Sequence, residues 1–234
     1  MSKTALITGA YRGLGFEAAR QLLKKGYGVV ITARKAGAGE KAADALARET
    51  GGKTWFVALD VTNEKSIQAA AKETAGLVNH LDVLINNAAI FPDPSKAALD
   101  SSVALLTDAY ATNTIGPLFV ARAFAPLLKE ATDGGRIINI SSGLGALNEM
   151  QNGHTAYSLS KTALNAVTRQ LAGAFADDGI AVNSVCPGWC RTEMGGADAT
   201  RSAEEGAAGI VWLATEAPAK ATGKFWRDRQ EIPW

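Results

Sequence analysis

The sequence has little of the residues that build cross-links and metal centres. Only two of its 234 residues are cysteines and two are histidines. Two thiols in a chain of this length exclude a disulfide framework, and the pair Cys186 and Cys190, without neighbouring His or Cys, is a poor zinc site. We therefore predict no metal site, and we expect both thiols to pack as small apolar side chains.

An excess of one charge and long apolar runs are also lacking. The formal net charge is +1, which gives no field to attract nucleic acid. No run approaches the roughly 20 apolar residues of a membrane span, and the N-terminus lacks the apolar core of a signal peptide. These absences predict a cytoplasmic protein without nucleic-acid or membrane partners.

Short apolar runs that alternate with longer helical patterns make up most of the chain. Hydrophobic residues account for 47% of the sequence, enough for one sizeable core. Strands are predicted at 4–8, 29–33, 54–59, 81–86, 136–141, 180–186 and within 222–232. Helices are predicted at 13–25, 39–49, 64–78, 155–177 and 202–216, with two more in 101–130 separated by a kink or break at Gly116 and Pro117.

The predicted strands are almost continuously apolar, which is typical of a parallel sheet covered on both faces. A helix between successive strands indicates right-handed βαβ units. The sequence contains no linker, repeat or low-complexity segment. It therefore predicts one α/β domain over residues 1–234, a doubly wound Rossmann fold with a parallel sheet of about seven strands.

A glycine-rich loop, TGAYRGLG at 8–15, lies between the first predicted strand and the first predicted helix. Glycine allows a sharp turn, a close approach of the backbone to a pyrophosphate, and tight packing of the helix on the sheet. The helix N-terminus would present free N–H groups to the phosphates. A second cluster, Gly51 to Thr54, resembles the end of a P-loop, but a predicted strand follows it and we interpret it as a turn. The predicted cofactor contacts in the first loop are Gly9, Tyr11, Arg12, Gly13, Leu14 and Gly15.

The end of the second predicted strand distinguishes NAD from NADP. An acidic residue there binds the ribose 2′-hydroxyl, whereas a basic residue accommodates a 2′-phosphate. The sequence reads Ala33, Arg34, Lys35, with no acid. Arg34 has a planar fork suited to phosphate, and Arg12 is near enough in the fold to reach the same group. NADP(H) is therefore the predicted cofactor.

Tyr157 and Lys161 are four residues apart and share one face of the predicted helix at 155–177. A free tyrosine has a pKa of about 10, and a neighbouring ammonium favours the phenolate. At ~4 Å and an effective dielectric of ~20, the attraction is at most about 4 kcal/mol, or roughly three pKa units. The pair therefore predicts a tyrosine of lowered pKa that acts as a general acid or base.

Taken together, these motifs resemble the short-chain dehydrogenase/reductase family over essentially the whole chain. Each motif is loose by itself, but their order and spacing are highly specific. In sequence order they are TGAYRGLG at 8–15, Asp60, NNAA at 86–89, Asn113, INISS at 138–142, YSLSK at 157–161 and PGWCRT at 187–192.

The resemblance implies roles for four catalytic residues. Tyr157 would donate the proton to the carbonyl oxygen, and Lys161 would lower the pKa of that tyrosine and bind the nicotinamide ribose. Ser142 would orient and polarise the carbonyl, and Asn113 would hold a water that links Lys161 to solvent.

The resemblance also implies further cofactor contacts beyond the glycine loop. Asp60 and Val61 would touch the adenine, and Asn86 and Ala88 would line the adenosine ribose. The nicotinamide amide and the phosphates would be held by Pro187, Gly188 and Thr192.

Within the family, the resemblance is strongest to the NADPH-dependent carbonyl reductases. The segment Gly143 to Ala156 is short, however, and lacks the long insertion that monomeric carbonyl reductases carry before the catalytic tyrosine. The resemblance therefore implies a homodimer or homotetramer that pairs through the helices at 101–130 and 155–177. It also implies that Cys190 places a thiol near the nicotinamide, while Trp189 is a candidate wall of the substrate pocket.

The expected reaction is reversible hydride transfer between NADPH and a small aldehyde or ketone. A 3-oxoacyl thioester reductase or a sugar or sterol dehydrogenase of the same family would keep the same catalytic residues. These enzymes differ in the substrate loop, expected at about 190–205, and its small polar residues do not identify a substrate. A protein of another class, a non-catalytic NADP sensor, would typically have lost the tyrosine or the lysine.

Overall fold

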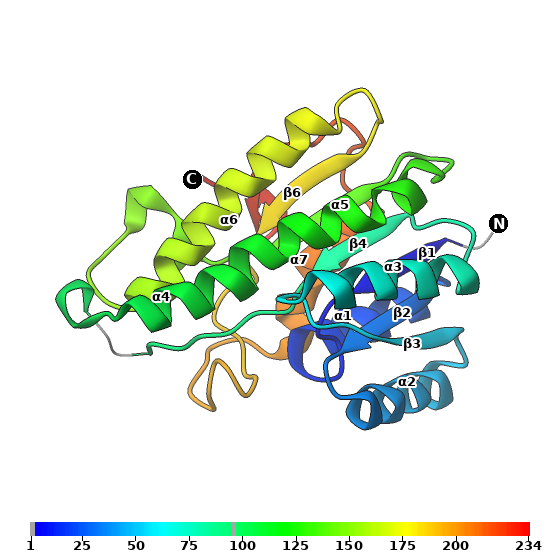
Figure 1. The fold of residues 1–234 in the computed structure, drawn as a ribbon, viewed down its shortest axis with the longest axis horizontal. Helices are drawn as coiled ribbons and strands as arrows, with labels where there is room; N and C mark the ends of the chain where they lie inside the picture. The colour runs from blue at the N-terminus through cyan, green and yellow to red at the C-terminus, as the bar shows by residue number, and fades with distance from the viewer. Residues whose placement is uncertain (1–2, 95–96) are drawn as a thin grey trace.

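The computed structural model describes residues 3–94 and 97–234, which form one eight-stranded sheet with helices on both faces (Figure 1). The strand order is β3-β2-β1-β4-β5-β6-β7-β8, and every neighbouring pair is parallel except β7 and β8. The predicted Rossmann fold is confirmed, with the two-residue β8 added to seven parallel strands. The strands are β1 Thr4–Ile7, β2 Gly28–Ala33, β3 Thr54–Ala58, β4 Val83–Asn86, β5 Arg136–Ile140, β6 Ala181–Val185, β7 Phe225–Arg227 and β8 Gln230–Glu231.

Two hydrophobic layers hold the helices against the sheet. One layer lies under α1, α2 and α7, and the other under α3, α5 and α6. Every residue of β1 and β2 is buried, because both faces of these central strands are covered. The helices are α1 Gly13–Lys24, α2 Ala36–Thr50, α3 Glu64–Leu77, α4 Val103–Tyr110, α5 Gly116–Lys129, α6 Thr155–Ala174 and α7 Ala203–Thr215.

The predicted kink or break at Gly116 and Pro117 takes the form of a π-helical turn over Ala111–Ile115, directly between α4 and α5. Both ends of this turn keep helical dihedral angles, so the chain runs on without a break. Proline has no N–H, and Pro117 therefore cannot donate to the carbonyl of Asn113, its partner in an α-helix. The wider turn thus coincides with a residue predicted to be catalytic, as π-turns often do.

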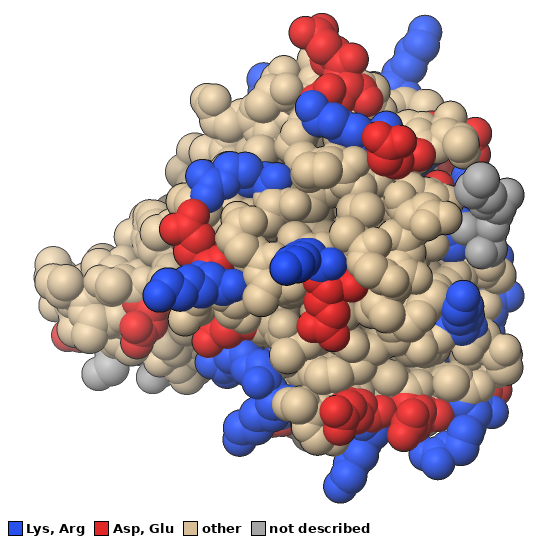
Figure 2. Space-filling model, turned by 45° about the vertical axis from the view of Figure 1, so that its right-hand side comes forward, with Lys and Arg blue, Asp and Glu red and all other residues tan. Residues whose placement is uncertain are grey.

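The carboxyl ends of β1, β4, β5 and β6 lie side by side, because these strands are parallel neighbours. The loops after them carry the glycine motif, NNAA, Ser142 and Pro187, so the fold brings the predicted motifs to one edge of the sheet. Acidic and basic side chains are interspersed over the face drawn in Figure 2. Within the described ranges, no helix is long and apolar enough to cross a membrane.

Candidate active site

The glycine loop and the NNAA loop form a tight cradle at the sheet edge. The Thr8 hydroxyl accepts from the backbone N–H groups of Asn87 and Ala88, both at 2.9 Å. Gly9 has φ +63°, and a Cβ there would lie 3.0 Å from the Cα of Ala88. A Cβ on Gly15 would lie 2.5 Å from the Asn87 amide nitrogen. Both glycines are therefore required for the close packing of the glycine loop against the NNAA loop.

Helix α1 begins at Gly13, within the glycine loop. Its N-cap residue, Arg12, makes no side-chain capping bond, so the first turn keeps unsatisfied donors that suit a pyrophosphate. The methyl carbon of Thr192 would lie 3.5 Å from a Cβ on Gly13, which places the loop after β6 across from the glycine loop. Tyr11 and Leu14 are half-buried in the same turn. The chain thus fits a dinucleotide at this position.

The two arginines predicted to read a 2′-phosphate differ in their surroundings. Arg34 directly follows β2 and is exposed. Arg12 lies over the Tyr11 ring and forms an ion pair with Glu193 of the loop after β6. Arg34 is therefore the freer of the two guanidinium groups, whereas Arg12 joins the glycine loop to the predicted substrate loop.

The residues predicted to surround the adenosine are only partly directed toward it. The Asp60 carboxylate accepts from the N–H and hydroxyl of Thr62, at 3.0 and 2.7 Å, and shapes its own turn. Val61 is buried and lines a pocket of about 210 Å³. The Asn86 side chain instead points into the interior, where it donates to the Asn139 side chain at 2.8 Å. Only the backbone of Asn86 is left to line a ribose.

Tyr157 lies in the first turn of α6 beside Ser142, which follows β5. Burial raises the pKa of Tyr157 to about 12, and a hydrogen bond with the Ser142 hydroxyl opposes part of that rise. The direction is opposite to the sequence-based prediction, which was wrong because it assumed that the ammonium of Lys161 dominates. Tyr157 is therefore a protonated phenol at neutral pH, the form that can donate a proton.

Lys161 is buried one turn further along α6. Its Nζ donates to the carbonyl of Ile140 at 2.7 Å and lies 5.6 Å from the centroid of the Tyr157 ring. Burial lowers the pKa of Lys161 to about 7. The lysine is thus close to the tyrosine as predicted, but it is anchored to the end of β5 and carries only part of a charge at neutral pH.

Asn113 is completely buried in the π-helical turn and ties three elements together. Its side chain accepts from the N–H of Ile90 and donates to the carbonyl of Ile90, both at 2.9 Å. It also donates to the Ser160 hydroxyl at 3.0 Å. Ser160 directly precedes Lys161, so Asn113 connects the segment after β4 to the catalytic helix.

The sequence predictions missed several residues that shape this site. Thr8 and Asn87 fasten the two cofactor loops together. Phe91 packs its ring on that of Tyr157, with centroids 4.6 Å apart, and the Asp93 carboxylate accepts from backbone N–H groups of α6. The NNAA motif marks the start of this segment, but no sequence signal connects Asp93 to a helix that begins 62 positions later.

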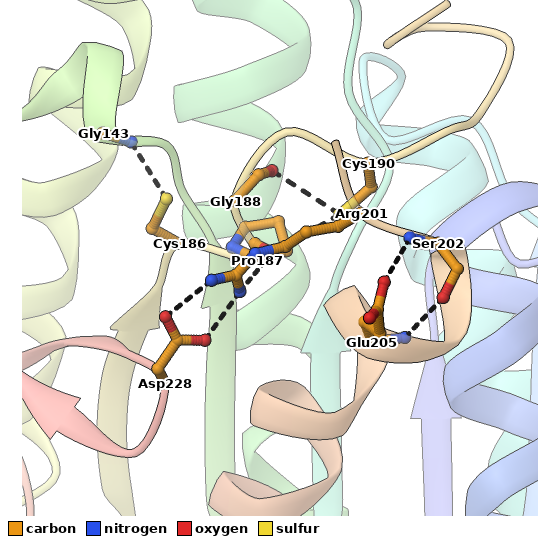
Figure 3. A network of polar contacts seen from close by, with 9 residues as sticks. All are labelled: Gly143, Cys186, Pro187, Gly188, Cys190, Arg201, Ser202, Glu205 and Asp228. Atoms are coloured by element: carbon orange, nitrogen blue, oxygen red, sulfur yellow. Dashed lines mark hydrogen bonds and ion pairs between the residues drawn. The ribbon is translucent and has the colours of Figure 1, made fainter. Parts of the chain in front are cut away.

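The loop after β6, which lies across from the glycine loop, carries a network of polar contacts (Figure 3). Arg201 makes a two-pronged ion pair with Asp228, at 2.6 and 2.7 Å, and donates to the Pro187 carbonyl at 3.4 Å. A Cβ on Gly188 would lie 2.8 Å from the Arg201 side chain. The two ends of the predicted substrate loop at about 190–205 are hydrogen-bonded to each other, and Arg201 attaches the loop to the turn between β7 and β8. The last residues of the predicted loop belong to α7.

Both thiols are buried. The Cys186 Sγ accepts from the N–H of Gly143 at 3.2 Å (Figure 3), which supports the residue next to Ser142. Cys190 lies close to Gly206 of α7, and burial raises the pKa of its thiol. Trp189, the candidate pocket wall, is 54% exposed and donates its indole N–H to Gly195.

A pocket of about 490 Å³ opens next to Ser142. Apart from Leu144, its side chains are polar, and they include Glu149, Gln151 and His154. Among the described residues, no group of three or more His, Cys, Asp or Glu side chains is placed to hold a metal ion.

Known proteins share both this sequence and this geometry. The short chain dehydrogenase family matches residues 3–205. The short-chain dehydrogenase anuI of Penicillium roqueforti is 35% identical over 242 residues, which cover 97% of this chain and 94% of the relative. Carbonyl reductase [NADPH] 1 of Rattus norvegicus is 30% identical, with 98% of each chain covered.

Two solved structures superpose closely. The NADPH-bound carbonyl reductase from chicken fatty liver gives a TM-score of 0.90 at 30% identity, covering 100% of this chain and 94% of that one. The carbonyl reductase Sniffer of D. melanogaster also gives 0.90 at 30% identity and covers 100% of both chains.

Proposed function

The chain belongs to the short-chain dehydrogenase family, as the sequence predicted, and from this we propose that it is an NADP(H)-dependent oxidoreductase that reduces an aldehyde or ketone to an alcohol. The observation that carries this proposal is the grouping of Ser142, Tyr157 and Lys161 at the sheet edge that also carries the glycine cradle. Relatives and structural neighbours named as NADPH carbonyl reductases support it.

In this reaction the bound nicotinamide supplies the hydride, while the protein orients the reactants and supplies the proton. Tyr157 donates its proton to the carbonyl oxygen, and the Ser142 hydroxyl holds the same oxygen by a hydrogen bond. Lys161 keeps the tyrosine and the nicotinamide ribose in place. Asn113 fixes the helix through Ser160. Its backbone carbonyl, which Pro117 leaves without its usual helical donor, would accept a hydrogen bond from a water that leads to solvent.

The preference for NADP(H) rests on Arg34. Its guanidinium follows β2, where the ribose of a dinucleotide lies in this fold, and no acidic side chain competes for the 2′-position. When NADP(H) is bound, Asp60 and Val61 would border the adenine, the backbone of Asn86 and Ala88 would border the ribose, and Pro187, Gly188 and Thr192 would hold the nicotinamide end.

The proposal is tested by NADPH oxidation with a panel of aldehydes, ketones, 3-oxoacyl thioesters, sugars and sterols. We expect turnover with simple carbonyl compounds, and loss of turnover with retained NADPH binding in Tyr157→Phe. Turnover restricted to thioesters, sugars or sterols would assign the chain to another branch of the family. NADPH binding without any turnover would identify a sensor.

The proposal also covers the oligomeric state and the cellular location of the protein. The substrate is a small molecule, and the protein is a cytoplasmic homodimer or homotetramer. The π-turn, α5 and α6 expose Ile115, Leu118 and Leu159, apolar side chains that a second copy would cover. Light scattering during size-exclusion chromatography distinguishes a monomer of 24.4 kDa from a dimer or tetramer.

A further inference from the structure

We propose that Asp93 is a positioning residue for Tyr157. Its carboxylate caps the N-terminus of α6 from a distant segment of the chain and thereby fixes the position of the phenol. This inference rests on the proposed function, because it concerns how the proton donor of that reaction is held. Asp93 belongs to none of the motifs that connect the chain to its family.

The contacts of Asp93 are those of a helix cap. The carboxylate is completely buried. One oxygen accepts from the N–H of Ala156 at 2.5 Å, and the other accepts from the N–H of Tyr157 at 3.2 Å. These are the second and third residues of α6, whose donors an N-cap side chain normally satisfies. Here a residue more than 60 positions away takes over that task.

The local sequence does not provide a cap of its own. His154, the N-cap residue of α6, makes no side-chain capping bond, and its backbone is in the left-handed region with φ 51° and ψ 38°. An N-cap residue usually has extended backbone angles that turn its side chain toward the first N–H groups. The unusual conformation of His154 is therefore compatible with a stable helix start because Asp93 provides the acceptors.

The rest of the segment 90–93 contacts the same catalytic residues. The backbone of Ile90 exchanges two hydrogen bonds with Asn113. Phe91 packs on the rings of both Tyr157 and His154, with centroid distances of 4.6 and 5.2 Å. Pro92 fixes one backbone angle between Phe91 and Asp93. Tyr157 is thus held at its main chain by Asp93 and at its ring by Phe91.

Positioning follows from where these bonds act. The Tyr157 hydroxyl must stay beside Ser142, and the ring extends from a Cα whose own N–H is bonded to Asp93. Loss of the carboxylate would free the first turn of α6, and a displacement of ~1 Å at a reacting group can cost about 100-fold in rate. The cofactor cradle is built by other residues and should be unaffected.

The test compares Asp93→Ala and Asp93→Asn with Ser102→Ala. Ser102 caps α4 in the ordinary way, by accepting from Leu105 N–H at 3.3 Å, and has no place in the site. For Asp93→Ala we expect kcat to fall about 10- to 100-fold, with the NADPH dissociation constant within about 2-fold of wild type. Asp93→Asn keeps an acceptor oxygen for one of the two N–H groups and should therefore have a kcat between those of Asp93→Ala and wild type. Ser102→Ala should lower Tm by about 2–4 °C and leave kcat unchanged.

Hydrogen exchange at the amides of Ala156 and Tyr157 separates this inference from the proposed function. We expect faster exchange at these two amides in Asp93→Ala. Unchanged exchange there, or a kcat equal to that of Ser102→Ala, overturns the role of Asp93. A fall in kcat matched by an equal loss of NADPH affinity also overturns it, since that pattern indicates a general structural effect. Absence of turnover in the wild-type protein contradicts the proposed function instead.

Discussion

The two sides of the site are held by different forces. On one side, hydrogen bonds between partly or fully buried groups hold the catalytic helix: Asn113 donates to Ser160, Ser160 donates to the Tyr157 carbonyl, and Lys161 donates to the Ile140 carbonyl at the end of β5. On the other, the loop after β6 is attached through two partly exposed ion pairs, Arg12 with Glu193 and Arg201 with Asp228. Figure 3 shows the second of these pairs. Buried hydrogen bonds hold a fixed geometry, whereas exposed ion pairs contribute little and are screened by salt. The difference suits a rigid side for chemistry and an adjustable side for binding.

The largest expected effect is the pH dependence of stability that the buried Lys161 produces. The pKa of Lys161 is lowered to about 7 in the folded protein, so between pH 7 and 10.5 the unfolded chain binds the proton that the folded chain has lost. Stability should therefore rise with pH in this window, by at most about 1.4 kcal/mol per pH unit. Below pH 7 the full cost of the buried charge remains. Tm measured across this range for wild type and Lys161→Met should show a rise that the variant lacks, and parallel curves would contradict a depressed lysine pKa.

The next effect comes from the close packing of Gly145 against Lys161 in α6. A Cβ on Gly145 would lie 2.7 Å from the Cβ of Lys161 and 2.8 Å from its carbonyl carbon. Gly145→Ala should therefore push α6 away, destabilise the protein by ~1–3 kcal/mol in chemical unfolding, and lower kcat. Gly173 lies in α6, and a Cβ added there would have nothing within 4 Å. Gly173→Ala should therefore be neutral or slightly stabilising. Equal stability of the two variants would show that the buried side is more tolerant than proposed.

Cofactor choice is expected to depend on a single exposed charge. Arg34→Glu should raise KM for NADPH by about 10- to 100-fold, since a hydrogen bond to a charged group contributes ~1.5–3 kcal/mol, and it should leave kcat at saturation little changed. Lys41→Glu changes the net charge by the same amount on the exposed surface of α2 and should have no comparable effect. An unchanged NADPH preference in Arg34→Glu would remove the basis for the cofactor assignment.

The smallest expected effect is on the ion-paired side. Asp228→Asn removes the pair with Arg201, and asparagine tolerates the left-handed backbone at this position, where φ is 53°. Because an exposed pair contributes at most about 1 kcal/mol, KM for NADPH should rise no more than ~5-fold, with kcat unchanged. Asp198→Asn in the same loop, whose carboxylate makes no ion pair within the described ranges, serves as the control. A fall in kcat instead would mean that this side also takes part in the chemistry.

Local patterns were enough to predict the sheet, the glycine loop and the Tyr157–Lys161 pair. Continuous apolar runs identify buried parallel strands, and a spacing of four residues fixes one helical face whatever the rest of the chain does. The resemblance then connected Ser142 and Asn113 to that helix. Predicted and observed element ends differ by at most three residues, the largest difference being that of α2, which begins at Ala36 where residue 39 was expected, and of α6, which ends at Ala174 where residue 177 was expected.

What could not be predicted depends on segments that meet only in the fold. The capping of α6 by Asp93, the pairing of Arg12 with Glu193 and the inward direction of the Asn86 side chain all join distant parts of the chain. The pKa of Tyr157 was predicted with the wrong sign for the same reason: charge spacing along a helix can be read from sequence, whereas burial cannot.

The most direct test is the single-turnover rate of hydride transfer from NADPH to a carbonyl substrate in Tyr157→Phe, measured together with NADPH affinity. The phenyl ring keeps the contact with Phe91 but has no proton to donate. We expect the rate to fall about 10²- to 10⁴-fold while the NADPH dissociation constant stays within about 2-fold of wild type. A rate equal to that of wild type would show that the proton comes from elsewhere, and that the buried side of the site does not carry the chemistry.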